Sequence, residues 1–120
     1  MILRPANEAD CAAMAAIYAP YVNETDVSWE YEAPDAAEMQ TRLREHVAAG
    51  YPWLVAEEDG RMLGYAYAGR FAARRGFDWD AELTVYLDRA ERGRGAGSAL
   101  YAALLSCLRR QGVVNAYAPW

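Results

Sequence analysis

Apolar residues recur along the chain with two different periods. Spacing of three and four residues occurs in three stretches, after Asn7, after Pro34-Asp35 and over residues 98–108. Such spacing places side chains on one face of a helix, so these stretches predict three amphipathic helices. The residues expected to face inward are Cys11, Met14, Ile17, Tyr18 and Tyr21 in the first helix, and Met39, Leu43 and Val47 in the second.

Capping residues mark the predicted helix ends. Asn7 and Asp35 can accept hydrogen bonds from the first N–H groups of the helices that follow them. Glu38 stands three residues after Asp35, which is a capping-box pattern. Gly50 and Gly112 follow the second and third helices as stop signals.

Shorter apolar or alternating runs predict extended segments. They span residues 2–4, 27–31, 53–57, 62–68, 81–87 and 113–118. Asp59-Gly60 is a strong hairpin signal between two of these runs. The connection over residues 70–80 is long for a compact domain and is therefore a candidate binding segment. The order of elements predicts an α/β domain.

Length and composition favour one globular domain over residues 1–120, because 54% of the residues are hydrophobic and 24% are charged. Arg4, Glu8 and Asp10 interrupt the start, and no apolar run reaches the length of a membrane span. A cytoplasmic protein without a membrane segment is therefore expected. Cys11 and Cys107 fall on apolar helix faces, which argues against a disulfide or a metal site.

Charge is distributed unevenly along the chain. The net charge of −5 argues against broad affinity for nucleic acids, which requires a basic surface. Arg89, Arg92 and Arg94 nevertheless concentrate positive charge in one short stretch. A basic site on an acidic protein suits a small polyanion better than a long one.

Two of these arginines lie in a glycine-rich turn, Arg92-Gly93-Arg94-Gly95-Ala96-Gly97, between a predicted strand and a predicted helix. A helix that opens on such a turn presents unpaired N–H groups beside the positive end of its dipole, and this arrangement binds phosphate. The spacing fits neither G-x-G-x-x-G nor the P-loop. It fits Arg-x-x-Gly-x-Gly through Arg92, Gly95 and Gly97. The alternative is a plain turn that its arginines keep solvated.

This turn resembles the coenzyme A pyrophosphate loop of the GNAT acyltransferase superfamily. Within the superfamily, the chain looks like the phosphinothricin and methionine sulfoximine N-acetyltransferases. The closer resemblance rests on five segments: Ile2-Leu3-Arg4-Pro5-Ala6, Ile17-Tyr18-Ala19-Pro20-Tyr21-Val22, Gly50-Tyr51-Pro52, Gly64-Tyr65-Ala66 and Glu82-Leu83-Thr84-Val85-Tyr86-Leu87.

The resemblance implies a GNAT fold, which is a mixed, mostly antiparallel sheet flanked by helices. Family chains continue well beyond residue 120. The domain is therefore expected to be incomplete at its C-terminus, without the usual last elements. Those elements carry the tyrosine that often acts as general acid in the family.

The resemblance also implies acetyl-CoA as the cofactor. In GNAT folds the strand that corresponds to residues 81–87 splays away from its neighbour, so that its main-chain groups pair with the pantetheine arm. One N–H near Tyr86 or Leu87 then polarises the thioester carbonyl. The residues expected to bind the cofactor are Val85, Tyr86, Leu87, Arg92, Gly93, Arg94, Gly95, Ala96, Gly97 and Ser98.

Glu82 matches the position of the family's catalytic glutamate and is expected to accept the proton that the acceptor amine must lose. The pattern alone leaves open a second interpretation, a solvated charge on an edge strand. His46, late in the second helix, is expected to be a surface residue whose charge suits the helix dipole.

The acceptor is expected to contact aromatic and charged residues outside the glycine turn, because an arginine can hold an amino-acid carboxylate through two hydrogen bonds. The family often has Phe-Arg-x-Arg where this chain reads Phe71-Ala72-Ala73-Arg74, so one arginine is lost. An exposed basic pair is the alternative for Arg74 and Arg75. The candidate acceptor-binding residues are Trp29, Glu30, Phe71, Arg74, Arg75 and Thr84.

The resemblance thus implies direct transfer of an acetyl group from acetyl-CoA to the α-amine of a small amino-acid-like acceptor. It also implies a homodimer, because members of the family often form dimers. Two alternatives stay open. One is an acetyltransferase for another amine, such as a polyamine or an aminoglycoside. The other is a non-catalytic module that holds coenzyme A or pairs with itself through an unfinished sheet edge.

Overall fold

The computed structural model describes residues 1–24, 33–70, 80–90, 95–110 and 115–117. Within these ranges one sheet has the order β1-β2-β3-β4-β5. The first four strands are antiparallel to their neighbours, and β5 runs parallel to β4. The predicted α/β architecture with a mixed, mostly antiparallel sheet is confirmed. The strands are β1 (Ile2–Pro5), β2 (Trp53–Glu58), β3 (Arg61–Arg70), β4 (Asp80–Leu87) and β5 (Asn115–Tyr117).

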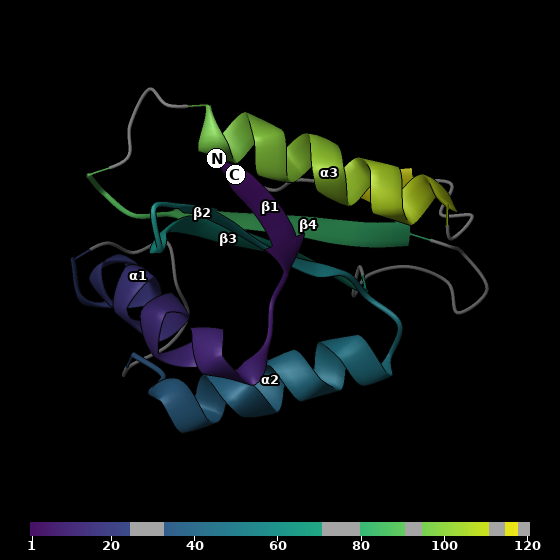
Figure 1. The fold of residues 1–120 in the computed structure, drawn as a ribbon. Coiled ribbons are helices and arrows are strands. Elements are labelled where there is room, and N and C mark those ends of the chain that lie inside the picture. Colours follow the sequence, from purple (N-terminus) through teal and green to yellow (C-terminus); the bar gives the residue numbers. More distant parts are fainter. Residues whose placement is uncertain (25–32, 71–79, 91–94, 111–114, 118–120) are drawn as a thin grey trace.

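Helices cover both faces of the sheet (Figure 1). The helix α3 (Ala96–Arg110) lies on one face, and α1 (Cys11–Glu24) and α2 (Ala36–Ala48) lie together on the other. A single 3₁₀ turn, η1 (Glu8–Asp10), leads into α1. No helix in the described ranges has both the length and the apolar character needed to cross a membrane.

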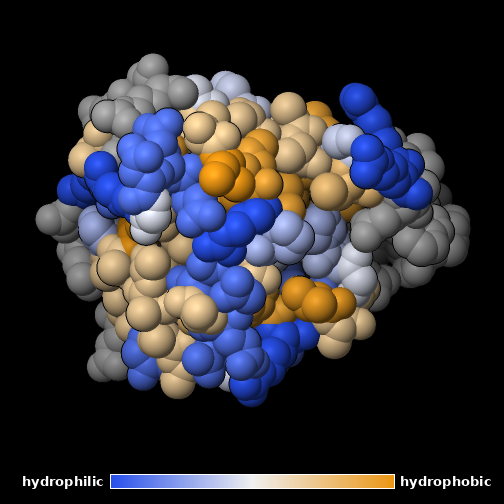
Figure 2. Space-filling view, viewed as in Figure 1, coloured by the Kyte–Doolittle hydropathy of each residue, from blue (hydrophilic) through white to orange (hydrophobic). Residues whose placement is uncertain are grey.

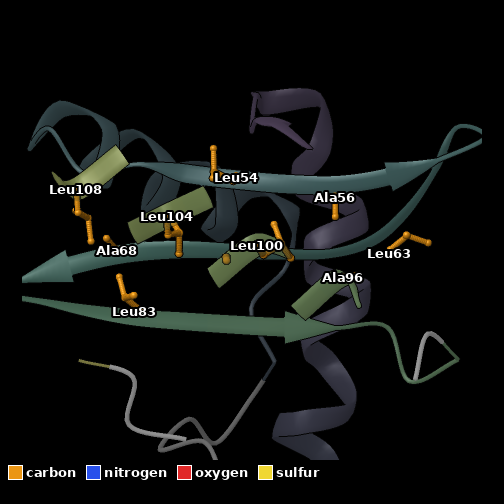
Figure 3. Close-up of a cluster of buried hydrophobic side chains, with 10 residues drawn as sticks. Leu54, Ala56, Leu63, Ala68, Leu83, Ala96, Leu100, Leu104 and Leu108 are labelled. Atoms are coloured by element: carbon orange, nitrogen blue, oxygen red, sulfur yellow. The ribbon is translucent and has the colours of Figure 1, made fainter. Parts of the chain in front are cut away.

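The face of the sheet under α3 is aliphatic. Leu100, Leu104 and Leu108 recur every fourth residue along α3 and are at most 2% exposed. They point toward the sheet together with Ala96 (Figure 3). Side chains of a strand alternate between its two faces, so every second residue of the central strands meets this helix. The sheet contributes Leu54, Ala56, Leu63, Ala66, Ala68 and Leu83 to the cluster.

The opposite face is aromatic, because the residues between those aliphatic ones are mostly large rings. Trp53 stacks on Tyr67 with 4.2 Å between ring centroids and on Tyr65 with 5.9 Å. Its indole Nε1 donates a hydrogen bond to the sulfur of Met14 at 3.2 Å, which ties α1 to β2. The helices contribute Cys11, Met14, Ile17, Tyr18, Met39 and Leu43 to this core, as the helical spacing predicted.

Two predictions about α2 are wrong. Val47 is 57% exposed rather than inward-facing, and His46 is half-buried rather than on the surface. The inward row runs from Met39 to Leu43 and then continues three residues on to His46, because helix geometry permits either a three- or a four-residue step. The cap also differs from expectation. Asp35 accepts the Glu38 N–H at 2.9 Å, but the Glu38 carboxylate pairs with Arg42.

Other boundaries differ slightly from the sequence prediction. The helix α3 begins at Ala96, ahead of its apolar run, and β3 continues to Arg70. The predicted extended segment over 27–31 lies outside the described residues, and so does the Gly112 stop signal. A capping box forms at Asn7, where the Asn7 side chain accepts the Ala9 N–H and Asp10 accepts the Asn7 N–H.

An ionic cluster joins the edge strand to the start of α1. The guanidinium of Arg4 donates to both carboxylate oxygens of Asp10, at 2.8 and 2.7 Å, and to Glu57 at 2.9 Å. Asp10 is 8% exposed. Hydrogen bonding to Arg4 lowers the pKa of Asp10 below its ordinary value, and the Asn7 N–H acts in the same direction.

The edge strand β1 also carries exposed apolar side chains. Met1, Ile2 and Leu3 are 50%, 59% and 37% exposed. Figure 2, which has the same viewpoint as Figure 1, shows small hydrophobic areas separated by hydrophilic residues on this side of the molecule. Scattered apolar residues of this kind are normal for a protein surface.

Gly64 in β3 lies where β4 approaches most closely. A Cβ at this position would come 2.7 Å from the Tyr86 carbonyl oxygen and 2.6 Å from the Leu87 side chain. We expect Gly64→Ala to lower the free energy of unfolding by about 1–3 kcal/mol, since backbone cannot move aside as a flexible side chain does. Urea unfolding measures the change.

Gly69→Ala is the matched control, because it is the same substitution in the same strand. A Cβ there meets only the His46 ring, at 3.4 and 3.8 Å. The control is expected to change stability by no more than about 0.5 kcal/mol. Equal losses in the two variants would contradict the account of the β3–β4 contact.

The Asp10 carboxylate is expected to make stability depend on pH. Because its folded-state pKa is lowered, its contribution is complete above about pH 4, the ordinary aspartate range, and is lost as the pH falls through the folded value. Asp10→Asn should cost about 2 kcal/mol at pH 7 and progressively less in acid. Urea unfolding from pH 7 to pH 2.5 tests this, with Glu8→Gln, in an exposed pair with Arg44, as the control.

Candidate functional site

The N-terminus of α3 is held against the end of β4. Gly95 has a φ of +77°, and its carbonyl accepts the first helical hydrogen bond, from Ala99 N at 3.0 Å. The N–H groups of residues 96–98 therefore have no partner within the helix. A Cβ on Gly97 would come 3.3 Å from Leu87, so the missing side chain lets the helix pack closely on the strand. The predicted strand-to-helix arrangement is present.

The positive φ explains why glycine stands at position 95. Residues with a side chain rarely adopt this conformation. Gly95 is also exposed, with no atom within 4 Å of the place a Cβ would occupy. The backbone there faces solvent and is open to a ligand, as a phosphate-binding helix terminus requires.

Among the described residues, one edge of β4 is paired only at its start, and the rest of that edge, residues 83–87, is called the open edge. In the described part of the chain, β5 pairs with residues Asp80, Ala81 and Glu82 of β4, at the start of the strand. The other edge pairs with β3 along residues 81–87. From Leu83 onward, the strand therefore has a described partner on the β3 side alone.

The hydrogen-bond alternation identifies which main-chain groups face the open edge. The N–H of Asp88 donates to Leu63 of β3 at 2.9 Å. Successive residues of an antiparallel strand direct their N–H and C=O groups to opposite sides, so those of Leu87 and Val85 point away from β3. The hydrogen bonding of Leu87 is consistent with this orientation, because its carbonyl accepts a hydrogen bond from the Tyr21 hydroxyl of α1 at 3.0 Å.

The same alternation separates Tyr86 from its neighbours. Its main-chain groups face β3, opposite Tyr65 in the register. Its ring lies on the aromatic face, 4.8 Å from the Tyr18 ring and 5.0 Å from that of Tyr21. The geometry thus favours Val85 and Leu87 over Tyr86 as main-chain donors at the open edge.

Glu82 lies on the aromatic face of the sheet, next to the point where β5 ends its pairing. It is half-buried and sits opposite Gly69 in the β3–β4 register, and Thr84 sits opposite Tyr67. Burial raises the pKa of Tyr67 to about 12, and nearby Tyr86 and Glu82 act in the same direction, while a hydrogen bond with Thr84 opposes them. Tyr67 is therefore a neutral phenol near neutral pH, and among the described residues Glu82 is the acidic group whose charge acts on it.

A model of a known protein family matches the amino-acid sequence of this chain. It is described as an acetyltransferase (GNAT) domain and matches residues 3–119. The chain belongs to the GNAT acetyltransferase family.

Named relatives agree with the assignment to the GNAT family. A phosphinothricin N-acetyltransferase of Streptomyces viridochromogenes is 40% identical over 110 residues, covering 92% of this chain and 60% of its own. An L-methionine sulfoximine/L-methionine sulfone acetyltransferase of Salmonella typhimurium is 36% identical over 112 residues, which are 93% and 66% of the two chains. The chain thus spans less than two thirds of the length of these relatives.

A solved GNAT structure agrees with the fold. The phosphinothricin acetyltransferase of Sinorhizobium meliloti, crystallised in complex with AcCoA, superimposes with a TM-score of 0.84 at 34% identity. The match covers 91% of this chain and 60% of that one.

The structure brings together only part of the predicted GNAT site. Glu82, Thr84, Val85, Tyr86 and Leu87 lie on β4. Gly95 directly precedes α3, and Ala96, Gly97 and Ser98 are its first residues. Ala96 is buried in the aliphatic core, so only its main chain is available, whereas the side chain of Ser98 is exposed. The other candidates lie outside the described residues: Trp29, Glu30, Phe71, Arg74, Arg75, Arg92, Gly93 and Arg94.

Two residues near the site were not predicted to belong to it. Tyr21 was assigned to the core, but its hydroxyl reaches the open edge of β4. His46 was assigned to the surface, but its ring packs on the aromatic face beside Gly69. A helical pattern indicates which side of a helix is buried, but it does not indicate where the polar end of a tyrosine or histidine lies.

Proposed function

We propose that the chain carries the acetyl-CoA site of an N-acetyltransferase that acts on the α-amine of a small amino-acid-like acceptor. The observation that carries the proposal is the open edge of β4, which ends at the N-terminus of α3. The names of the relatives, which refer to phosphinothricin and methionine sulfoximine, support the acceptor class. The expected homodimer and cytoplasmic location stay predictions.

The residues present suit coenzyme A in two respects. The main-chain N–H and C=O groups of Val85 and the N–H of Leu87 line the open edge, and the Leu87 carbonyl accepts the Tyr21 hydroxyl. An extended amide-containing arm can pair with such groups as a strand would. The N–H groups of residues 96–98 and the helix dipole suit the pyrophosphate. When bound, acetyl-CoA would supply an acetyl thioester within reach of both β4 and the aromatic face.

Proton transfer falls to Glu82. An α-amine is largely protonated at neutral pH and must lose a proton before it can attack a carbonyl carbon. The half-buried Glu82, beside the start of the open edge, would accept that proton, either directly or through one water. Main-chain donors at Val85 or Leu87 would stabilise the negative charge that develops on the carbonyl oxygen.

Acetyl-CoA is expected to stabilise the folded chain, because a ligand that binds only the folded state shifts the unfolding equilibrium by mass action. The melting temperature should rise with millimolar acetyl-CoA. Gly95→Asp should remove most of that rise, since it places a carboxylate and a strained backbone at the pyrophosphate position.

Gly50→Asp is the matched control for the strain. Gly50 is also exposed, has a φ of +87° and has no atom within 4 Å of the place a Cβ would occupy, but it follows α2. The control should lose stability without losing the rise with acetyl-CoA. An undiminished rise in Gly95→Asp would exclude this loop as the phosphate site.

Glu82→Gln is expected to separate chemistry from cofactor binding. The amide cannot accept the proton, so kcat/KM should fall about 10²- to 10⁴-fold, while the thermal stabilisation by acetyl-CoA persists. Thiol release with L-methionine sulfoximine as acceptor measures turnover. Glu45→Gln, on the exposed side of α2, is the control, and equal turnover in the two variants would remove Glu82 from the reaction.

A further inference from the structure

His46 has a defined place on the aromatic face. Its ring meets Trp53 edge-on, with 5.1 Å between centroids and an interplanar angle of 88°, and meets Tyr67 at 5.0 Å and 71°. The residue is half-buried at the end of α2. Two ring contacts from two different strands fix the plane of the imidazole.

A hydrogen bond fixes which nitrogen carries the proton. The Nδ1 atom lies 2.8 Å from the carbonyl oxygen of Arg42. A carbonyl oxygen can only accept, so Nδ1 is the donor, and the neutral ring therefore has its lone pair on Nε2. The second nitrogen is left to act as an acceptor.

Nε2 is directed at a position of β3 that has no side chain. A Cβ on Gly69 would lie 3.4 Å from Nε2 and 3.8 Å from Cδ2. Gly69 pairs directly with Glu82 in the register. Side chains of such a pair begin about 5 Å apart on the same face, so the Glu82 side chain starts beside the position of Gly69 that Nε2 faces.

We infer that His46 is a positioning residue that takes over the proton from Glu82 across Gly69. This inference rests on the proposed function. The acceptor ammonium gives one proton to the Glu82 carboxylate, and the carboxyl passes it through one water to Nε2. Glu82 is then a carboxylate again and His46 is an imidazolium, which releases the proton to solvent through its exposed side.

Few titratable groups face the ring within the described part of the chain. Tyr67 from β3 packs on the ring, and the charge of Arg42 from α2 acts on Tyr67. Glu82 from β4 lies across Gly69 in the register, and Trp53 from β2 does not titrate. Arg42 of α2 presents its carbonyl to the ring, while its guanidinium pairs with Glu38 at 3.2 Å. We therefore expect removal of the Glu82 carboxylate to change the NMR signal of His46.

Proton NMR tests the coupling without any need for turnover, because His46 is the single histidine of the chain. The pH dependence of its Cε1–H resonance should change in Glu82→Gln, because the variant lacks the carboxyl group that would exchange a proton with Nε2 across Gly69. Glu45→Gln removes an exposed carboxylate next to His46 in sequence and should change that pH dependence less.

Gly69→Ala provides a second variant that keeps both groups and puts a methyl 3.4 Å from Nε2. It should also change the pH dependence of the resonance, by displacing the bridging water, and it remains an independent test if Glu82→Gln does not fold. A pH dependence that is unchanged in the folded Glu82→Gln and Gly69→Ala variants would overturn the inference.

Kinetics provide the second test. His46→Gln retains a polar side chain but cannot carry the proton, so kcat/KM should fall about tenfold and the acid limb of its pH profile should move to lower pH. His46→Phe keeps the ring contacts and should behave alike. If the pH dependence of kcat/KM in both variants equals that of the unsubstituted chain, the inference is overturned. Absence of turnover in the parent chain would instead count against the proposed function, and the NMR titration would still decide the coupling.

Discussion

The structure depends on β4, whose side chains alternate between the two faces of the sheet and whose main-chain groups alternate between its two edges. Each of these four sides has a different environment. One edge is paired with β3 over residues 81–87, and the other is paired with β5 only over residues 80–82. One face presents Leu83, Val85 and Leu87 to α3, and the other presents Glu82, Thr84 and Tyr86 to the aromatic core. A shift of one residue in register would exchange all four environments.

The two cores differ in chemistry because they position different parts of the site. The aliphatic core under α3 brings the helix close enough for Gly97 to touch Leu87, so it places the helix N-terminus. The aromatic core holds polar atoms in fixed orientations, such as the Tyr21 hydroxyl and the His46 nitrogens. Under the proposed function, packing on one side would position the phosphate site, and ring contacts on the other would orient the groups that transfer protons.

Much of the fold could be predicted from the sequence. Periodic apolar spacing indicates which face of a helix or strand is buried, and glycines indicate where the chain turns. The leucines of α3, the cap at Asp35 and the Asp59-Gly60 hairpin are all local signals. The choice of His46 over Val47 as the inward residue was not predictable, since a three-residue step and a four-residue step both fit a helix. The Tyr21 contact with Leu87 joins residues 66 positions apart, and no local pattern carries that information.

The contact among Gly64, Leu87 and Gly97 has an evolutionary consequence. Leu87 fills space that side chains at the two glycines would otherwise occupy, since a Cβ would lie 2.6 Å from it at Gly64 and 3.3 Å from it at Gly97. Side chains at these three positions would occupy the same space, so the size of the residue at one position limits which substitutions the other two can accept. Among related chains, a larger residue at position 97 is expected to accompany a shorter one at position 87, which would make the triplet visible as correlated substitution.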